Sequence, residues 1–259
     1  TSKLCGVDEF YTYGGAQAVS GMAYGTETIP KVDLICGPGN VFVMAAKKSV
    51  YGDVGVDGIF GPTETLIICD NTANKEFVVS DLMAQAEHDV LALPMLITDD
   101  LGFANDINKL YSNKLGDLSR KEIISKSMDR GFISILNGID EMIEVCNNIA
   151  AEHTTIASEK LIEISKKITS SGSLFLGEIS SEVLADYVAG PSHVMPTNGS
   201  AKYSSSLSTR TFSKSIPVLS INKTEFEKIC SDGELLASLE SLDAHKNALS
   251  VRKNFFIGD

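Results

Sequence analysis

The sequence predicts an α/β protein with mainly parallel sheets, and two observations lead to this fold class. Short apolar runs typical of strands alternate with segments of helical periodicity through most of the 259 residues. Helices that separate successive strands connect them in parallel and cover both faces of a sheet. The composition, 43% hydrophobic and 22% charged, is typical of a globular chain with one large or two smaller domains.

The elements follow one another in a regular order. A strand over residues 32–37 leads through the turn Gly37-Pro38-Gly39-Asn40 into a helix over 41–51. The same alternation then predicts strands at 65–70, 94–98, 132–136 and 173–177, and helices at 75–88, 139–150 and 159–169. Beyond residue 199 the rhythm stops, and we expect a polar stretch over 202–215, a strand at 216–221 and a helical region over 223–251.

Three regions result from this division. We expect residues 1–62 to form part of a nucleotide-binding Rossmann-like domain and residues 63–207 to form a second Rossmann-like domain, each of them incomplete. Residues 208–259 form a small, mostly helical C-terminal module. The chain does not begin with Met and opens close to a strand-like segment, which suggests a partial sequence.

Charge and cysteine content argue against nucleic-acid binding, membrane binding and a disulfide-stabilised fold. The formal net charge of −12 disfavours binding to nucleic acids and to anionic membrane surfaces. No apolar run is long enough to span a bilayer, and the first residues have no features of a targeting signal. The five cysteines are scattered without a CxxC pair, so we expect reduced thiols in a cytoplasmic protein.

The four histidines all lie in polar clusters. Gln85 and His88 stand three residues apart at the end of a predicted helix, so their side chains share one face and can converge on one ion. The same spacing also fits an ordinary helix C-terminus with a favourable histidine. Glu152 and His153 follow a helix at an expected turn, where imidazole and carboxylate suit two separate acid–base tasks or simply a solvated loop.

Two further clusters are equally open to two interpretations. Asp186 and His193 flank a Gly-Pro turn that can direct both side chains into one cleft, or they cap the end of a helix. Glu240 and His245 lie five residues apart in the C-terminal helical region. They either belong to a functional site or lie on an exposed polar helix face. The possible metal ligands in all these clusters are oxygen and nitrogen donors without a thiolate, which suit zinc, with manganese or cobalt as possible substitutes.

Two glycine-rich turns precede predicted helices. Gly14-Gly15 follows an expected strand and comes just before Gln17, and Gly37-Pro38-Gly39 comes just before Asn40. Glycine at such a turn lets backbone amides approach a phosphate group beside the helix N-terminus. Neither turn is a GxGxxG or P-loop motif, and small turns of this kind also occur for purely structural reasons.

Taken together, these segments resemble the histidinol dehydrogenase family along essentially the whole chain. The resemblance is carried by eight ordered blocks: GGAQAV (14–19), KVDLICGPGN (31–40), FGPTETL (60–66), SDLMAQAEHD (80–89), AAEHTT (150–155), GSLFLG (172–177), ADYVAGPSHVMPT (185–197) and LDAHKNAL (242–249). It implies NAD-dependent oxidation of L-histidinol through the aldehyde to L-histidine, with Zn²⁺ bound. An ordered set of blocks is far more specific than any single motif.

The resemblance also implies a role for each matching residue. Glu152 and His153 match the catalytic pair, and Gln17 and Asn40 match positions that contact NAD. The zinc ligands would be Gln85, His88 and Asp186 of one subunit with His245 from the C-terminal tail of the partner in an intertwined homodimer. Contacts with the substrate are implied for these four ligands, for His153, and for Thr63, His193 and Glu240. Thr63 replaces a serine that many members have and keeps its hydroxyl.

One departure and three alternatives accompany this interpretation. Family members carry a sizeable segment ahead of Thr1, so the chain as given could be an inactive fragment. A related zinc and NAD enzyme acting on another polar alcohol, such as a sulfonated diol, would share the ligands, but Glu240 favours a cationic amine over a sulfonate. A zinc hydrolase with Glu152 as base is the third alternative, and four protein ligands would leave it no open metal position.

Overall fold

The computed structural model describes residues 1–256 and 258. It divides into two compact units, Thr1–Phe212 and Ser213–Asp259. The first unit contains both parallel sheets and the second contains only helices and extended chain, so the α/β class with mainly parallel sheets is confirmed. Within the described residues, no helix has the length and apolarity needed to cross a membrane. All five cysteines are free thiols.

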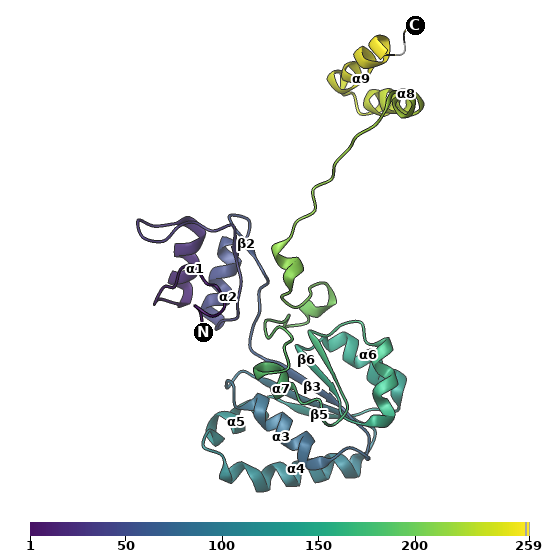
Figure 1. Ribbon diagram of the computed structural model, residues 1–259. Coiled ribbons are helices and arrows are strands. Elements are labelled where there is room, and N and C mark those ends of the chain that lie inside the picture. Colours follow the sequence, from purple (N-terminus) through teal and green to yellow (C-terminus); the bar gives the residue numbers. More distant parts are fainter. Residues whose placement is uncertain (257, 259) are drawn as a thin grey trace. The chain divides into compact units, whose positions relative to one another are not determined.

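A five-stranded parallel sheet forms the centre of the first unit (Figure 1). Its strand order is β5-β4-β3-β6-β7, with β3 Glu64–Ile68 in the middle. The others are β4 Leu93–Thr98, β5 Phe132–Ile135, β6 His153–Ile156 and β7 Ser173–Leu176. The chain therefore builds the sheet outward from its centre, first toward β5 and then toward β7, as doubly wound folds do.

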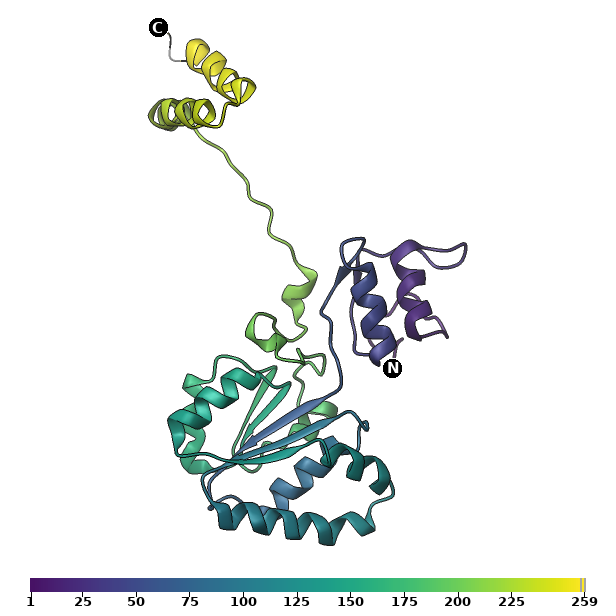
Figure 2. The same ribbon diagram turned by 180° about the vertical axis from the view of Figure 1, so that it is seen from behind.

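Helices cover both faces of this sheet (Figures 1 and 2). The helices α3 Lys75–Ala86, α4 Leu101–Lys114 and α5 Lys121–Met128 pack on one face, whereas α6 Ile139–Ile149 and the 3-10 segment η2 Glu159–Lys167 pack on the other. Leu66 and Ile68 of β3 belong to the core under α6, and Ile67 belongs to the core under α3. Burial on both faces explains why β3 is apolar without alternation.

The amino-terminal part of the first unit has a small core of its own. It contains α1 Gly15–Tyr24, β1 Leu34–Ile35, α2 Val41–Val50 and β2 Gly55–Val56, and the two short strands pair in parallel. Its core consists of Val19, Ala23, Ile35, Val50 and Val54. The expected strand before α1 is wrong, because residues 1–14 form turns and irregular chain.

Several other expectations need correction. Residues 216–221 form no strand, because no neighbouring strand pairs with them among the described residues. The helical region that follows is two helices, α8 Lys223–Leu239 and α9 Asp243–Phe256, separated at Ser241, which has a positive φ of 60°. Three short 3-10 turns, η1 Leu115–Asp117, η3 Ser200–Lys202 and η4 Thr209–Phe212, and the short helix α7 Glu182–Tyr187 complete the structure.

Candidate active site

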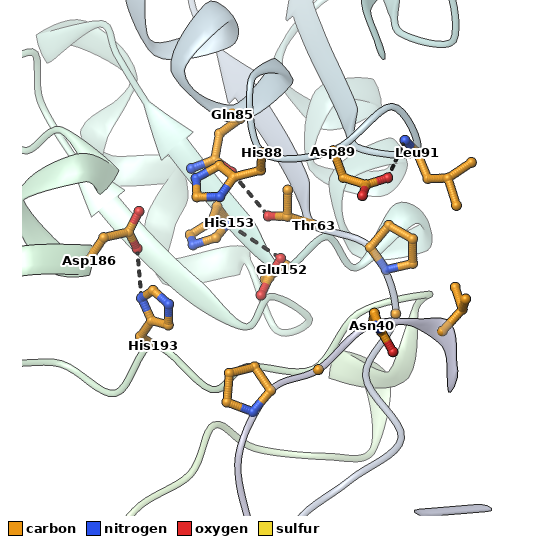
Figure 3. A pocket seen from close by; sticks show the side chains of 15 residues that line it. Asn40, Thr63, Gln85, His88, Asp89, Leu91, Glu152, His153, Asp186 and His193 are labelled. Atoms are coloured by element: carbon orange, nitrogen blue, oxygen red, sulfur yellow. Dashed lines mark hydrogen bonds and ion pairs between the residues drawn. The ribbon is translucent and has the colours of Figure 1, made fainter. Parts of the chain in front are cut away.

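A cavity of about 400 Å³ lies at the edge of the central sheet where the parallel strands begin (Figure 3). Thr63 precedes β3, Leu91 precedes β4 and Glu152 precedes β6, and all three line the cavity. Ligands of open α/β sheets usually bind at the opposite edge, beyond the carboxyl ends of the strands. The strand order alone would therefore place a site at the wrong edge of this sheet.

Eight of the residues singled out from the sequence line this cavity. They are Asn40, Thr63, Gln85, His88, Glu152, His153, Asp186 and His193. Gln17 is exposed on α1 and does not line it. Glu240 and His245 belong to the second unit, where both line a separate hollow of the α8–α9 hairpin.

The chain reaches Glu152 and His153 through a sharp reversal at the end of α6. Ala150 adopts the left-handed conformation there, with a φ of 53°, and the following residues enter β6. His153 is the first residue of β6, so the expectation that the pair lies in a turn is wrong for the histidine. Both side chains nevertheless face the cavity, with His153 Nδ1 3.7 Å from Glu152 Oε2.

Contacts on two sides hold the His153 ring. Its Nδ1 lies 3.3 Å from the backbone oxygen of Glu64, and the ring stacks on Phe175 with centroids 5.9 Å apart. A carbonyl oxygen can only accept a hydrogen bond, so this contact assigns the proton to Nδ1 and leaves the lone pair on Nε2. Nε2 is buried without a protein partner among the described residues. It is therefore available as a base.

Burial shifts the pKa values of this pair in opposite directions. Desolvation lowers the pKa of His153 to about 4, against the neighbouring Asp186 charge, which raises it. Desolvation raises the pKa of Glu152 to about 7, although the nearby Thr63 hydroxyl and a hydrogen bond from the Glu64 backbone amide favour its ionised form. At neutral pH the imidazole is therefore uncharged, and the carboxyl is close to half ionised.

The three predicted metal ligands of this unit come from the end of α3, from the turn after it and from α7. Gln85 lies in the last turn of α3, and His88 lies in the turn that follows, because α3 ends at Ala86 rather than at His88. Asp186 lies on α7. Gln85 Oε1 accepts a hydrogen bond from Thr63 Oγ1 at 3.0 Å, and Asp186 Oδ1 is 3.2 Å from His193 Nδ1.

The chemistry of this donor set fits zinc. An imidazole, a carboxylate and an amide oxygen border one cavity, and none of the cavity residues is a cysteine. Within residues 1–256 and 258, no three His, Cys, Asp or Glu side chains lie close enough together to hold one metal ion. Gln85 is not one of these four residue types, so His88 and Asp186 with the Gln85 amide oxygen would form a three-ligand set that leaves room for a further donor.

A fully buried carboxyl group lies behind the metal-ligand candidates. Glu182 of α7 has no exposed surface, and its Oε2 is 2.8 Å from Thr65 Oγ1. Burial raises the pKa of Glu182 to about 8, whereas the nearby Thr65 hydroxyl and Gln85 amide lower it. Glu182 Oε1 and Gln85 Nε2 are both buried, and neither completes a hydrogen bond within the described part of the chain.

The loop that carries Asn40 is fixed by a buried ion pair. Lys47 Nζ lies 2.6 Å from Asp57 Oδ1, with side chains 4% and 1% exposed, and it also donates to the Gly37 carbonyl. The Gly37 amide donates to Asp57 Oδ2 at 2.7 Å. Asn40 Oδ1 caps α2 by accepting from two backbone amides, so its Nδ2 keeps its donors for another partner.

The family model described as histidinol dehydrogenase matches residues 1–253. The chain belongs to the histidinol dehydrogenase family.

Three relatives illustrate this membership. The chain is 44% identical to the histidinol dehydrogenase of Dehalococcoides mccartyi over 96% of its own length and 57% of the relative. It is 40% identical to that of Thermus thermophilus over 96% of the chain and 61% of the relative. A crystal structure of histidinol dehydrogenase from Elizabethkingia anophelis matches with a TM-score of 0.92 and 40% identity, over 97% of this chain and 58% of that one.

Membership confirms the resemblance drawn from the ordered sequence blocks. The chain spans 57–61% of the length of these relatives. Three side chains that support residues around the cavity were not predicted from the sequence: Phe175, Glu182 and Lys47. The one available signal was the spacing of Glu182 and Asp186, four residues apart on one face of a helix.

Proposed function

We propose that the protein carrying this chain is a histidinol dehydrogenase that oxidises L-histidinol through L-histidinal to L-histidine with two molecules of NAD. One observation carries the proposal: the buried His153 imidazole and the buried Glu152 carboxyl face the same cavity, with His153 Nδ1 3.7 Å from Glu152 Oε2. Burial lowers the pKa of the imidazole to about 4 and raises that of the carboxyl to about 7. Two bases of different strength suit a reaction that removes one proton from an alcohol and another from water.

His153 is the base for the alcohol. Above pH 4 its ring is neutral, and the Glu64 carbonyl holds the proton on Nδ1, so Nε2 can accept the hydroxyl proton as the hydride leaves the carbinol carbon. Stacking on Phe175 fixes the plane of the ring. The same nitrogen is free to act again in the second oxidation after it releases its proton to solvent.

Glu152 is the base for water in the second oxidation. Its carboxylate removes a proton from the water that attacks the aldehyde carbon, which gives the hydrate anion. A bound NAD would supply the hydride acceptor for the oxidation of this hydrate. The Glu152 side chain is only 11% exposed, and burial favours its uncharged form below pH 7. Ionisation of Glu152 is therefore the step that makes this half of the reaction sensitive to pH.

Zinc and the substrate-contact residues would orient the alcohol. Gln85, His88 and Asp186 would hold Zn²⁺ together with His245 of a partner subunit, and the ion would supply an electrophilic anchor for the imidazole and amine of histidinol. Thr63 and His193 border the same cavity. Glu240 would provide a negative charge for the substrate ammonium group.

NAD would bind beside the amino-terminal part of the chain and supply the hydride acceptor. Asn40 lies at the N-terminus of α2, where backbone amides and the helix dipole favour phosphate, and Pro38 and Gly39 line the cavity next to it. Gln17 is the second proposed contact. A homodimer that exchanges C-terminal tails and a cytoplasmic location complete the proposal.

The decisive experiment measures NADH formation from L-histidinol, with zinc, by a chain extended to the length of its relatives. Strong turnover that a His153→Ala substitution abolishes would support both the activity and the role of the base. Absence of turnover with histidinol, together with NAD reduction by another polar alcohol such as a sulfonated diol, would move the assignment to a related dehydrogenase. Glu240 would then be the first residue to re-examine.

A further inference from the structure

The buried carboxyl group of Glu182 connects the elements that carry the proposed metal ligands. It lies on α7, four residues before Asp186, and so on the same helix face. Its Oε2 is bound to Thr65 of β3, the strand that begins just after Thr63. The adjacent Ser181 donates from Oγ to Asp81 Oδ1 of α3 at 2.9 Å, so α7 is fixed to α3 at this point.

The side chain of Gln85 lines the cavity and also lies near the Glu182 carboxyl. Its Oε1 accepts from Thr63 Oγ1, and its Nε2 is buried and has no partner among the described residues. Glu182 Oε1 is also buried and has no hydrogen-bond partner among the described residues. The Gln85 amide lies near enough to the Glu182 carboxyl to lower its pKa. An amide nitrogen that needs an acceptor is therefore close to a carboxyl oxygen that needs a donor.

We propose that Glu182 is a positioning residue that accepts a hydrogen bond from Gln85 Nε2 and thereby holds the amide oxygen of Gln85 toward the metal. An amide that rotated by half a turn would bring two acceptor oxygens together and point its NH₂ group toward the cation, so the Glu182 contact selects one of two orientations. The role requires only an acceptor at Oε1 and does not depend on the charge of the carboxyl. It rests on the proposed zinc enzyme.

Hydrogen bonds that orient a metal ligand commonly change metal affinity by about 10–100-fold when they are lost. We therefore expect Glu182→Met, which keeps the length of the side chain but removes the acceptor, to raise the zinc dissociation constant by about 10–100-fold. Glu182→Gln retains an acceptor oxygen for Gln85 and an NH₂ group for Thr65 Oγ1. Its zinc affinity should stay close to that of the unmodified protein.

The experiment compares these variants in the protein extended to the length of its relatives. Zinc affinity is measured by competition with a chromogenic chelator, and the visible absorption of the Co²⁺-substituted protein reports the geometry of the ligands. Ser181→Ala is the matched control, because it removes the neighbouring α7–α3 hydrogen bond without touching Gln85. It should lower the melting temperature slightly and leave both metal readouts unchanged.

Three results would overturn the inference: unchanged zinc affinity in Glu182→Met, equal weakening in Ser181→Ala, or equal weakening in Glu182→Gln. If Glu182→Met fails to fold, Thr65→Val takes its place, because it removes the hydroxyl that anchors Glu182 Oε2. Unchanged zinc affinity in Thr65→Val would then overturn it. A parent protein that binds no zinc and oxidises no histidinol would instead overturn the proposed function itself.

Discussion

At the scale of single residues, Glu152 sets the expected pH dependence of the reaction. Its pKa of about 7 is raised mainly by burial, and its proposed task requires the ionised form. The rate of aldehyde oxidation should therefore rise as pH increases through 7 and level off above it. The pKa of His153, lowered to about 4, leaves that group deprotonated over the whole range. Steady-state rates with L-histidinal between pH 5.5 and 9 would show the inflection.

The Glu152→Gln variant tests the origin of that inflection. It should lose about 10²–10⁴-fold in the rate of the aldehyde step, the usual contribution of a positioned base, and its remaining rate should not change near pH 7. Glu159, an exposed acid at the start of η2, provides the control substitution. An inflection near pH 7 that persists in Glu152→Gln would assign it to another group.

The residues that could be found from the sequence share a property. Glu152, His153 and Asp186 stand in polar clusters with chemistry of their own, so local composition was enough to single them out. Phe175 and Glu182 act through partners that are far away in the sequence, His153 and Gln85 among them. Nothing in their own neighbourhoods indicates burial against those partners, and only the fold brings them together.

At the scale of elements, close packing of β7 against Glu152 makes Gly172 a sensitive position. A Cβ at Gly172 would lie 2.5 Å from the Glu152 backbone oxygen, a distance that real structures do not tolerate. Gly172→Ala should therefore push the start of β6 away from the cavity. We expect a loss of at least about 10-fold in turnover together with a lower melting temperature, since a shift of 1 Å at a site can cost about 100-fold.

Gly131, just before the opposite edge strand β5, is the matched control. A Cβ there would lie 2.3 Å from the Pro94 carbonyl oxygen, an equally severe backbone clash, but neither residue lines the catalytic cavity. Gly131→Ala should lower the melting temperature and leave turnover per folded molecule unchanged. Equal activity losses in both variants would show that the Gly172 effect is general destabilisation.

The buried ion pair of Lys47 and Asp57 supports the loop that carries Asn40. Lys47→Met leaves the Asp57 carboxylate buried without its countercharge, which typically costs about 3–5 kcal/mol in the free energy of unfolding. Because Lys47 and Asp57 also hold Gly37, the KM for NAD should rise as well. Urea denaturation and NAD titration measure the two effects.

A second, exposed ion pair serves as a control for the effect of burial on stability. Lys75 and Asp106 also lie 2.6 Å apart, but their side chains are 42% and 45% exposed. Solvent screening leaves such a pair little net stability, so Lys75→Met should change neither the urea midpoint nor the KM for NAD appreciably. If both methionine variants behave alike, the buried pair does not stabilise the loop.

Elements were predicted well where the apolar pattern was long or strong. The strands β3 and β4 lie within a residue or two of their expected positions, because continuous burial on both faces gives an unbroken apolar run. The strand β6 begins with His153 and two threonines. These polar residues predict a loop from the sequence, although all three are buried in the structure. Residues 216–221 have the composition of a strand, but a strand also needs a partner to pair with.

At the scale of the whole molecule, the proposed zinc site depends on residues from two compact units of the chain. Gln85, His88 and Asp186 belong to Thr1–Phe212, whereas His245 belongs to Ser213–Asp259. Local sequence motifs could identify all four residues, but they contain no information on whether His245 acts in its own chain or in a partner. Exchange of C-terminal tails between subunits is implied only by the resemblance to the family.

Hybrid dimers decide between these two arrangements. One chain carries Gln85→Ala and the other His245→Ala, and each homodimer should be inactive in oxidising histidinol. If tails are exchanged, a mixed dimer contains one site with both defects and one site with none. Random mixing in equal amounts makes about half of the dimers mixed, so about one quarter of the unmodified activity should return.

The same mixture has a different outcome if His245 acts within its own chain. Every site would then contain either the Gln85 or the His245 defect, and no activity should return on mixing. Co-refolding the two variants and a control pair that carries the same defect on both chains separates these cases by NADH formation alone. Recovery of about one quarter in the mixture and none in the control would establish that each cavity takes its last metal ligand from the other subunit.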